Sequence, residues 1–324
     1  MNLNKRIRTF VFGALVFGGL GGQAGAQGWP VKPVRIVVPY AAGGAVDVVG
    51  RLIAPKMGEA FGQPVLVENR PGAGGNIGAE LVAKSSPDGY AVLLAPIGQA
   101  TSPALYRKLS YDPMDLTGVT QLIATEFVLV AQPKLPASGV REMVALSKTR
   151  TGGLNYGSTG VGAAPHLAVE LLASTAGAVL NHVPYKGDAP LNTALMAGEV
   201  DVAIVPISTA LPFINGGKIR ALAATGARRA RTLPDVPAIS ESVPGYEFTS
   251  WQSLFVATKT PRDTVQRLYR ESVRAVNAPE VREKLLAMGS EIVGSTPDEF
   301  EARYKADLVR FERVVREAKI PLQD

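Results

Sequence analysis

Short apolar runs rich in β-branched residues alternate with stretches of helical periodicity along most of the chain. The run 34–38 is typical of a buried strand. Apolar side chains then recur at helical spacing, at Val46, Val49, Ile53 and Met57, although Pro55 should kink or break that helix. Because a strand–helix–strand unit places its two strands side by side and parallel, the alternation predicts an α/β fold built on doubly wound parallel sheets.

The alternation falls into two units, separated by the proline- and glycine-rich segment QPKLPASG. Strand-like runs in the first unit lie at 34–38, 65–67 and 91–95. Those in the second lie at 154–156, 179–183, 200–205 and 219–224, with helical patterns between them. A chain of this length has enough residues for two lobes.

Two extended segments, 127–131 and 251–257, are the expected hinge strands where the chain crosses between the lobes. We predict that lobe 1 comprises 27–127 and 252–324 and that lobe 2 comprises 128–251. Two amphipathic helical stretches, at 264–277 and 297–319, close the chain. Such an architecture leaves a cleft between the lobes, where small-molecule sites often form.

The first 26 residues have the pattern of a secretory signal peptide. Lys5, Arg6 and Arg8 form a basic start, 10–20 is an apolar run, and 24–26 is a small-x-small cleavage site. The apolar run is too short and too rich in glycine to span a bilayer comfortably. We expect a secreted, soluble protein whose mature chain begins at Gln27.

Composition excludes several function classes. The leader contributes three of the six net positive charges, so the mature chain has a formal charge near +3, too low to support nucleic-acid binding but favourable to acidic ligands. Without cysteine there is no disulfide, thiol nucleophile or cysteine metal site. Histidine occurs only as His166 and His182, which excludes histidine-rich metal sites; we predict neither metal nor cofactor.

A glycine loop follows the first strand, in PYAAGGAVDVV. Gly43 and Gly44 permit backbone angles that other residues avoid, and a helix starts directly after them. The first turn of a helix carries unpaired N–H groups and partial positive charge, so anions bind well there. Asp47 can hydrogen-bond this loop and stands four residues before Arg51. A simple turn is the alternative interpretation of this junction taken alone.

The second unit repeats this arrangement in NYGSTGVGAAPHLAVELL. A strand leads to Ser158, Thr159 and Gly160, then to Gly162 and a helix that contains His166. Two such junctions, one in each lobe, can face each other across a cleft. A third junction, VPYKGDAP, adds Lys186 and a helix cap at Asp188.

Other interpretations of these glycines are weaker. The chain lacks the GxxxxGK[ST] pattern of a P-loop, and GAGGNIG at 72–78 stands too far from its strand for a dinucleotide fingerprint, so we interpret it as a packing turn. GSTG does not match the GxSxG nucleophile elbow. A secreted hydrolase using Ser158 with His166 is nevertheless the rival hypothesis from another class, and it needs an orienting acid and an oxyanion hole.

Taken together, these stretches resemble the Bug/TctC solute receptors of tripartite tricarboxylate transporters. The matching stretches keep their order and spacing through most of the mature chain: WPVKPVRIVVPYAAGGAVDVVGRLIA, VLVENRPGAGGNIGAELVAKSSPDGY, LYRKLSYDP, LNYGSTGVGAAPHLAVELL, VPYKGDAPLNTALMAGEVDV, GGKIRALAATGARRARTLPDVPAISE and VREKLLAMGSEIVG. The resemblance implies a type II periplasmic-binding-protein fold, a Venus flytrap whose two lobes close on a ligand.

The resemblance also implies a function. The chain would capture a small organic carboxylate in the periplasm and pass it to the integral-membrane permease subunits of the transporter, and we expect it to act as a monomer. A receptor that senses the ligand for signalling is an alternative with the same fold and ligand. The family holds one ligand carboxylate through backbone N–H groups and ordered water at the two loops. The expected ligand-binding residues are Tyr40, Ala41, Ala42, Gly43, Gly44, Asp47, Ser158, Thr159, Gly160, Gly162, His166, Lys186, Gly187 and Val205.

One departure from the family bears on the ligand. Many relatives carry an acidic residue near the position of Val205, whereas this chain has AIVPIS. A buried carboxylate suited to an ammonium group would then be missing, which disfavours an amino-acid ligand. The expected ligands are therefore aromatic acids, dicarboxylates and tricarboxylates, with an aromatic dicarboxylate such as terephthalate among the candidates.

Overall fold

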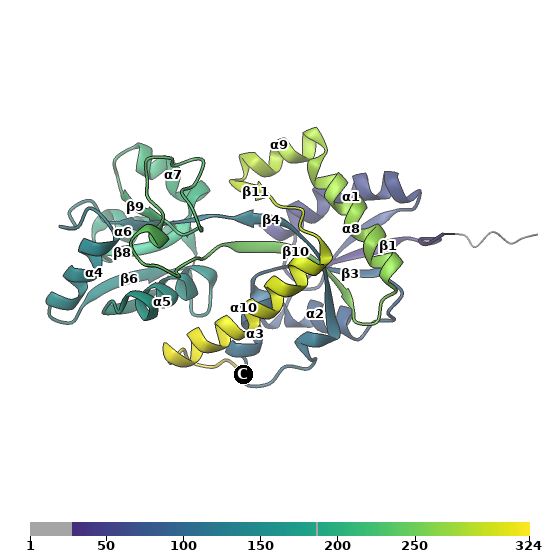
Figure 1. Cartoon of the computed structure of the whole chain (residues 1–324), viewed down its shortest axis with the longest axis horizontal. Coiled ribbons are helices and arrows are strands. Elements are labelled where there is room, and N and C mark those ends of the chain that lie inside the picture. Colours follow the sequence, from purple (N-terminus) through teal and green to yellow (C-terminus); the bar gives the residue numbers. More distant parts are fainter. Residues whose placement is uncertain (1–27, 186) are drawn as a thin grey trace, which may run out of the picture.

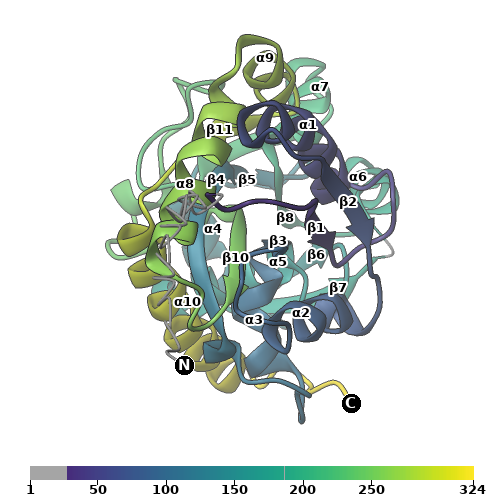
Figure 2. The same cartoon turned by 90° about the vertical axis from the view of Figure 1, so that its right-hand side faces the viewer.

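The computed structural model describes residues 28–185 and 187–324, which form two α/β units side by side (Figures 1 and 2). The first unit is built on six described strands in the order β11-β4-β10-β3-β1-β2, and the second on five in the order β7-β6-β8-β5-β9. The predicted α/β fold of two lobes is therefore confirmed. The predicted signal peptide and Lys186 lie outside the described residues.

The strands of the first sheet are β1 (Val34–Val38), β2 (Val65–Asn69), β3 (Ala91–Pro96), β4 (Leu116–Thr125), β10 (Ser250–Ala257) and β11 (Ser290–Ile292). The helices of the same unit are α1 (Ala45–Phe61), α2 (Asn76–Ala83), α3 (Gly98–Leu105), α8 (Arg262–Asn277), α9 (Pro279–Ala287) and α10 (Pro297–Glu317). Two short 3-10 turns, η1 (Ala73–Gly75) and η2 (Pro113–Asp115), complete the unit.

The strands of the second sheet are β5 (Phe127–Ala131), β6 (Leu154–Ser158), β7 (Leu180–Pro184), β8 (Val202–Pro206) and β9 (Arg220–Ala224). Its helices are α4 (Val140–Thr149), α5 (Ala164–Ala176), α6 (Asp188–Ala197) and α7 (Ile207–Asn215), and a 3-10 turn, η3 (Ile239–Glu241), follows β9. Among the described residues, none of these helices is long and apolar enough to cross a membrane.

Both sheets are mixed, whereas the sequence predicted parallel sheets. Strands β1, β2 and β3 are parallel to one another, and so are β6, β7 and β8. Strands β10 and β5, by contrast, run antiparallel to their neighbours. The reason is the chain path: β5 and β10 each enter a sheet from the other unit, so they start at the edge where the parallel strands end.

The two crossings position the candidate site. Only Glu126 separates β4 from β5, and the chain returns through 225–249 into β10. Gln252, near the start of β10, pairs with Pro96 at the end of β3, and Phe127, at the start of β5, pairs with Pro206 at the end of β8. The carboxyl ends of the parallel strands in both sheets therefore lie at the edges where the two units meet.

Helix α1 runs through Pro55, contrary to the predicted kink or break. Proline removes the N–H that would bond the carbonyl four residues earlier, here that of Arg51. Pro55 is exposed, so water can reach this turn of the helix. Burial of the opposite face, including Ile53 and Met57, keeps the helix intact through this position.

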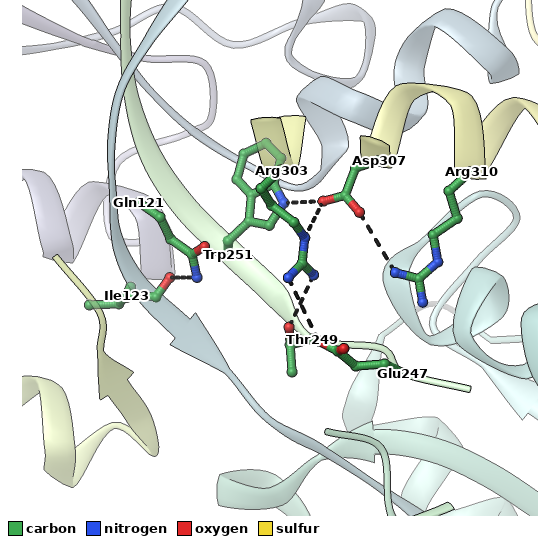
Figure 3. A network of polar contacts seen from close by, with 8 residues as sticks. All are labelled: Gln121, Ile123, Glu247, Thr249, Trp251, Arg303, Asp307 and Arg310. Carbon is green, nitrogen blue, oxygen red and sulfur yellow. Dashed lines mark hydrogen bonds and ion pairs between the residues drawn. The ribbon is translucent and has the colours of Figure 1, made fainter. Parts of the chain in front are cut away.

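Helix α10 contacts both units and holds the return crossing. It packs on α3 and β4 of the first unit and on α5 of the second (Figure 1). The buried Asp307 of α10 accepts hydrogen bonds from the indole Nε1 of Trp251 and from Nε of Arg303, each at 2.9 Å (Figure 3). Arg303 also donates to Thr249 Oγ1 at 3.4 Å and lies 3.7 Å from Glu247 Oε1. Polar contacts from one helix therefore hold the crossing segment directly before β10.

Candidate functional site

The loop after β1 is organised by a buried carboxylate. Asp47, on the first turn of α1, accepts from the backbone N–H of Gly43 at 2.8 Å and from Nε of Arg51 at 2.9 Å. Its other oxygen accepts from Asn69 Nδ2 at 2.9 Å. The hydrogen bond from Arg51 is the largest of several effects that lower the pKa of Asp47 to about 2. The predicted contacts of Asp47 with the loop and with Arg51 are thus confirmed, and their effect is to fix the loop.

The same contacts decide which amides of this loop are free. The N–H of Gly43, where φ is +84°, is used by Asp47. The N–H groups of Ala41, Ala42 and Gly44 have no acceptor in the part of the chain that the structure describes. The expectation that the whole segment from Ala41 to Gly44 offers its amides therefore needs correction, because Gly43 contributes backbone shape instead of a donor.

Tyr40 closes this loop against its neighbours. Its hydroxyl donates to the carbonyl oxygen of Gly74 at 3.1 Å, and its own carbonyl accepts from Asn69 Nδ2 at 3.0 Å. Burial is the main cause that raises the pKa of Tyr40 to about 12, so the hydroxyl keeps its proton. Gly74 belongs to the GAGGNIG segment, whose interpretation as a packing turn agrees with this contact.

The loop after β6 shows the same division of its amides. Gly160 N–H donates to Ser158 Oγ at 3.1 Å, and Gly162 N–H donates to Nδ1 of His166 at 2.9 Å. The N–H groups of Thr159 and Val161 have no acceptor within the described chain. Each glycine loop therefore uses some of its N–H groups internally and leaves others for a ligand, next to the start of helix α1 or α5.

Helix α3 brings the two loops close together. A Cβ atom on Gly98, the first residue of α3, would lie 3.1 Å from the hydroxyl of Tyr40. A Cβ atom on Gly162 would lie 2.9 Å from Cδ1 of Leu105, the last residue of the same helix. An eight-residue helix is about 12 Å long. Both loops therefore border one short helix at the junction of the two units.

The environment of Ser158 does not match the rival hydrolase. Its Oγ lies 2.6 Å from Nε2 of His182, and the predicted partner His166 bonds Gly162 instead. Ser158 is fully buried, and its hydroxyl also contacts both the N–H and the carbonyl of Gly160. A hydroxyl enclosed in this way supports the loop and is not presented to a substrate.

The remaining predicted site residues differ in their surroundings. Gly187 precedes α6 and has φ of +105°. Val205 is fully buried on β8, in an apolar cluster with Val128 and Leu191. Its side chain belongs to the core in this conformation, so its role as a ligand contact stays a prediction. His182, Asn69 and Leu105 were not predicted, because their importance depends on strand pairing and helix packing.

Two surface grooves lie away from the glycine loops. The larger, about 800 Å³, is bordered by α1 and the edge strand β2 and includes Pro55, Gln63 and Leu66. The smaller, about 590 Å³, lies where α1 meets α8 and α9. Neither contains a loop residue with a free N–H group, so the candidate ligand site rests on the two loops.

Comparisons with known proteins agree with this geometry. A family model described as "Tripartite tricarboxylate transporter family receptor" matches residues 49–320. The "UPF0065 protein in tcbD-tcbE intergenic region" of Pseudomonas sp. strain P51 is 35% identical over 295 residues, which cover 90% of this chain and 88% of the relative.

Two solved structures are similar over nearly the whole chain. R. palustris Rpa4515, solved with adipate, is 34% identical with a TM-score of 0.73, covering 91% of this chain and 100% of that one. MatC from Rhodopseudomonas palustris, solved with bound malate, is 31% identical with a TM-score of 0.70, covering 89% and 100%. The chain therefore belongs to the tripartite tricarboxylate transporter receptor family, as its sequence predicted, and is a periplasmic solute-binding receptor and not an enzyme.

Proposed function

We propose that this receptor captures a small organic carboxylate between the loops 40–44 and 158–162. Aromatic acids, dicarboxylates and tricarboxylates are the proposed ligands, with terephthalate among them. The observation that carries the proposal is a set of N–H groups that have no acceptor among the described residues, at Ala41, Ala42 and Gly44 in one unit and at Thr159 and Val161 in the other. Similarity to the proteins solved with adipate and malate supports the same ligand class.

Electrostatics favour an anion at these loops. Helices α1 and α5 start next to them, and a helix N-terminus carries partial positive charge that stabilises anions. The nearby carboxylate of Asp47 is balanced by Arg51, so it does not leave an uncompensated negative charge. The resemblance places Val205 near a position where many relatives carry an acidic residue, and a valine there would disfavour amino acids as ligands.

The wider role is proposed by analogy with the family. We propose that residues 1–26 direct export and are removed, and that the mature receptor works as a monomer. It would close its two lobes, 27–127 with 252–324 and 128–251, about the crossing strands, and deliver the ligand to permease subunits of a tripartite transporter. Closure biased by a ligand requires that the ligand contact both lobes, which donors on both loops would provide.

Calorimetry and thermal melting test the proposal. The panel contains adipate, malate, citrate, benzoate, terephthalate and glutamate, with adipamide and dimethyl terephthalate as uncharged controls. At least one carboxylate should bind with 1:1 stoichiometry and raise the melting temperature, while the two uncharged controls should do neither. Absence of heat and of melting shifts for every acid, or equal binding of the uncharged controls, would overturn the proposal.

A further inference from the structure

The two histidines of the chain are stacked on each other beneath the loop 158–162. Their ring centroids are 3.9 Å apart with an interplanar angle of 9°. Tyr156 of β6 stacks on His182 of β7, its partner in the parallel ladder, at 4.9 Å. His166 comes from α5 and is buried. Residues of two strands and one helix thus meet under the loop.

A hydrogen bond ties each imidazole to the loop. Gly162 N–H donates to Nδ1 of His166, so this nitrogen carries no proton and the ring is neutral. Ser158 Oγ donates to the Gly160 carbonyl and accepts from the Gly160 N–H. Nε2 of His182 lies 2.6 Å from the same hydroxyl, and this hydrogen bond holds Ser158 in place whichever of the two groups donates. Each histidine thereby holds one glycine of the loop, His166 directly and His182 through Ser158.

Burial favours the neutral form of both imidazoles. Burial lowers the pKa of both histidines, and the neighbouring His182 adds to this effect at His166. On α5, Glu170 lies 3.8 Å from Nε2 of His166, and burial raises the pKa of this carboxyl. On β6, the Tyr156 hydroxyl donates to the same carboxylate and keeps its proton, because burial raises its pKa.

We propose that His166 and His182 are positioning residues that select which N–H groups of the loop 158–162 are offered to the ligand. His166 accepts from the N–H of Gly162, and His182 holds Ser158, which accepts from the N–H of Gly160. Among the described residues, the N–H groups of Thr159 and Val161 are then the loop donors without an internal acceptor. The inference rests on the proposed function, since it assigns these donors to the carboxylate. Neither histidine needs to touch the ligand.

Four substitutions separate this role from simple packing. An asparagine places its side-chain oxygen near the position of the imidazole Nδ1, whereas a glutamine places its amide near Nε2. His166→Asn and His182→Gln therefore keep the contacts that the loop needs. His166→Gln and His182→Asn put similar polar groups at the wrong nitrogen. If the histidines only fill space, asparagine and glutamine should not have opposite effects at His166 and at His182.

The first readout needs no ligand. In protein labelled with ¹⁵N-glycine, the amide of Gly162 should exchange with solvent at least tenfold faster in His166→Gln than in His166→Asn. The amide of Gly160 should respond in the same way to His182→Asn and not to His182→Gln. Identical amide shifts and exchange rates in all four variants would overturn the proposed positioning.

The second readout is calorimetric affinity for adipate, or for whichever acid of the panel the unsubstituted protein binds best. His166→Gln and His182→Asn should weaken binding about tenfold or more, and His166→Asn and His182→Gln by less than threefold. A change in the glycine amides without a change in affinity would overturn the role in binding. If the unsubstituted protein binds none of the acids, the proposed function fails, and the amide readout alone decides whether the histidines position the loop.

Discussion

Gly289 lies so close to Ser208 that a Cβ atom on the glycine would be 2.6 Å from the Cβ of the serine. Ser208 is on α7 of the second unit, and Gly289 is in the turn between α9 and β11 of the first. The two units therefore touch through backbone and a small side chain, away from the crossing strands. Together with the contact of Gly162 with Leu105, this approach limits how closely the units can come together.

Gly289→Ala should weaken carboxylate binding several-fold, because its methyl group opposes the approach of the two units. The substitution also strains a backbone with φ of +72° and should cost about 1 kcal/mol of stability. Adding Ser208→Gly removes the clashing atom, so the double variant should recover affinity but not stability. Gly217→Ala is the control, since Gly217 has φ of +64° with open space around it. Lower affinity in this control as well would contradict the explanation.

The two substitutions Gly44→Ala and Gly44→Pro should differ in their effect on carboxylate affinity. Gly44 has φ of −75°, which both residues adopt, and an added Cβ would make an ordinary 3.5 Å contact with the Ala41 carbonyl. Alanine keeps the N–H group and should bind nearly as well as glycine. Proline removes it and should weaken binding at least tenfold, since hydrogen bonds to a charged group are worth about 1.5–3 kcal/mol. Equal affinities in calorimetry would show that this amide does not meet the ligand.

Stability should fall in mildly acidic solution because of His166. Its pKa in the folded protein is lowered to about 3, below the ordinary value of 6.5. Between these values the unfolded chain binds a proton that the folded chain does not, so the free energy of unfolding decreases as pH falls below 6.5. From pH 7 to 5.5 the loss from this residue should be about 1 kcal/mol. The variant His166→Asn keeps the Gly162 contact but cannot titrate, so its free energy of unfolding in urea should fall less between pH 7 and 5.5. An equal fall in the variant and the unsubstituted protein would refute the assignment.

Asp307→Asn should destabilise the protein by about 1–3 kcal/mol in urea unfolding. Trp251 and Arg303 donate to the same oxygen, Oδ2, so an asparagine oxygen at that position can still accept from both. The negative charge that compensates Arg303 and Arg310 is lost, however, and the amide nitrogen faces Arg310. Glu312→Gln on the same helix is the control, because its ion pair with Arg316 is exposed. Exposed pairs contribute at most about 1 kcal/mol. Similar losses in both variants would mean that the buried network of Figure 3 contributes no more to the free energy of unfolding than an exposed ion pair.

The sequence predicted the parts of the fold that short patterns specify. The strand–glycine–helix junctions at Gly43 and Gly160 appear in local composition, because only glycine tolerates the backbone there. Strand β4 was missed, since α8 and α10 both pack against it and its pattern neither alternates nor stays apolar. Its Gly118 approaches the ring of Phe300 on α10, a contact that no nearby sequence reveals.

The details of the site depended on contacts between distant segments. Ser158 and His182 are 24 residues apart and meet only because β6 and β7 pair in parallel register. The N–H of Gly43 donates to Asp47 and is not free for a ligand, and this depends on how the loop bends over the start of the helix. Local composition predicted a glycine turn before a helix at both loops, whereas assigning an acceptor to each amide needed three-dimensional geometry.

The C-terminal end of the chain is a neighbour of the loop 158–162. Gln323 donates its N–H to the Leu105 carbonyl at 2.7 Å and accepts from the N–H of Arg107 at 3.0 Å. Its side-chain amide would be 3.5 Å from a Cβ on Gly162. A purification tag or surface linker attached at this end would therefore disturb the loop that it is meant to leave free. The same proximity makes the end of the chain a suitable attachment point for a fluorescent dye. Under the proposed function, its emission would follow occupancy of the site and turn the receptor into a carboxylate biosensor.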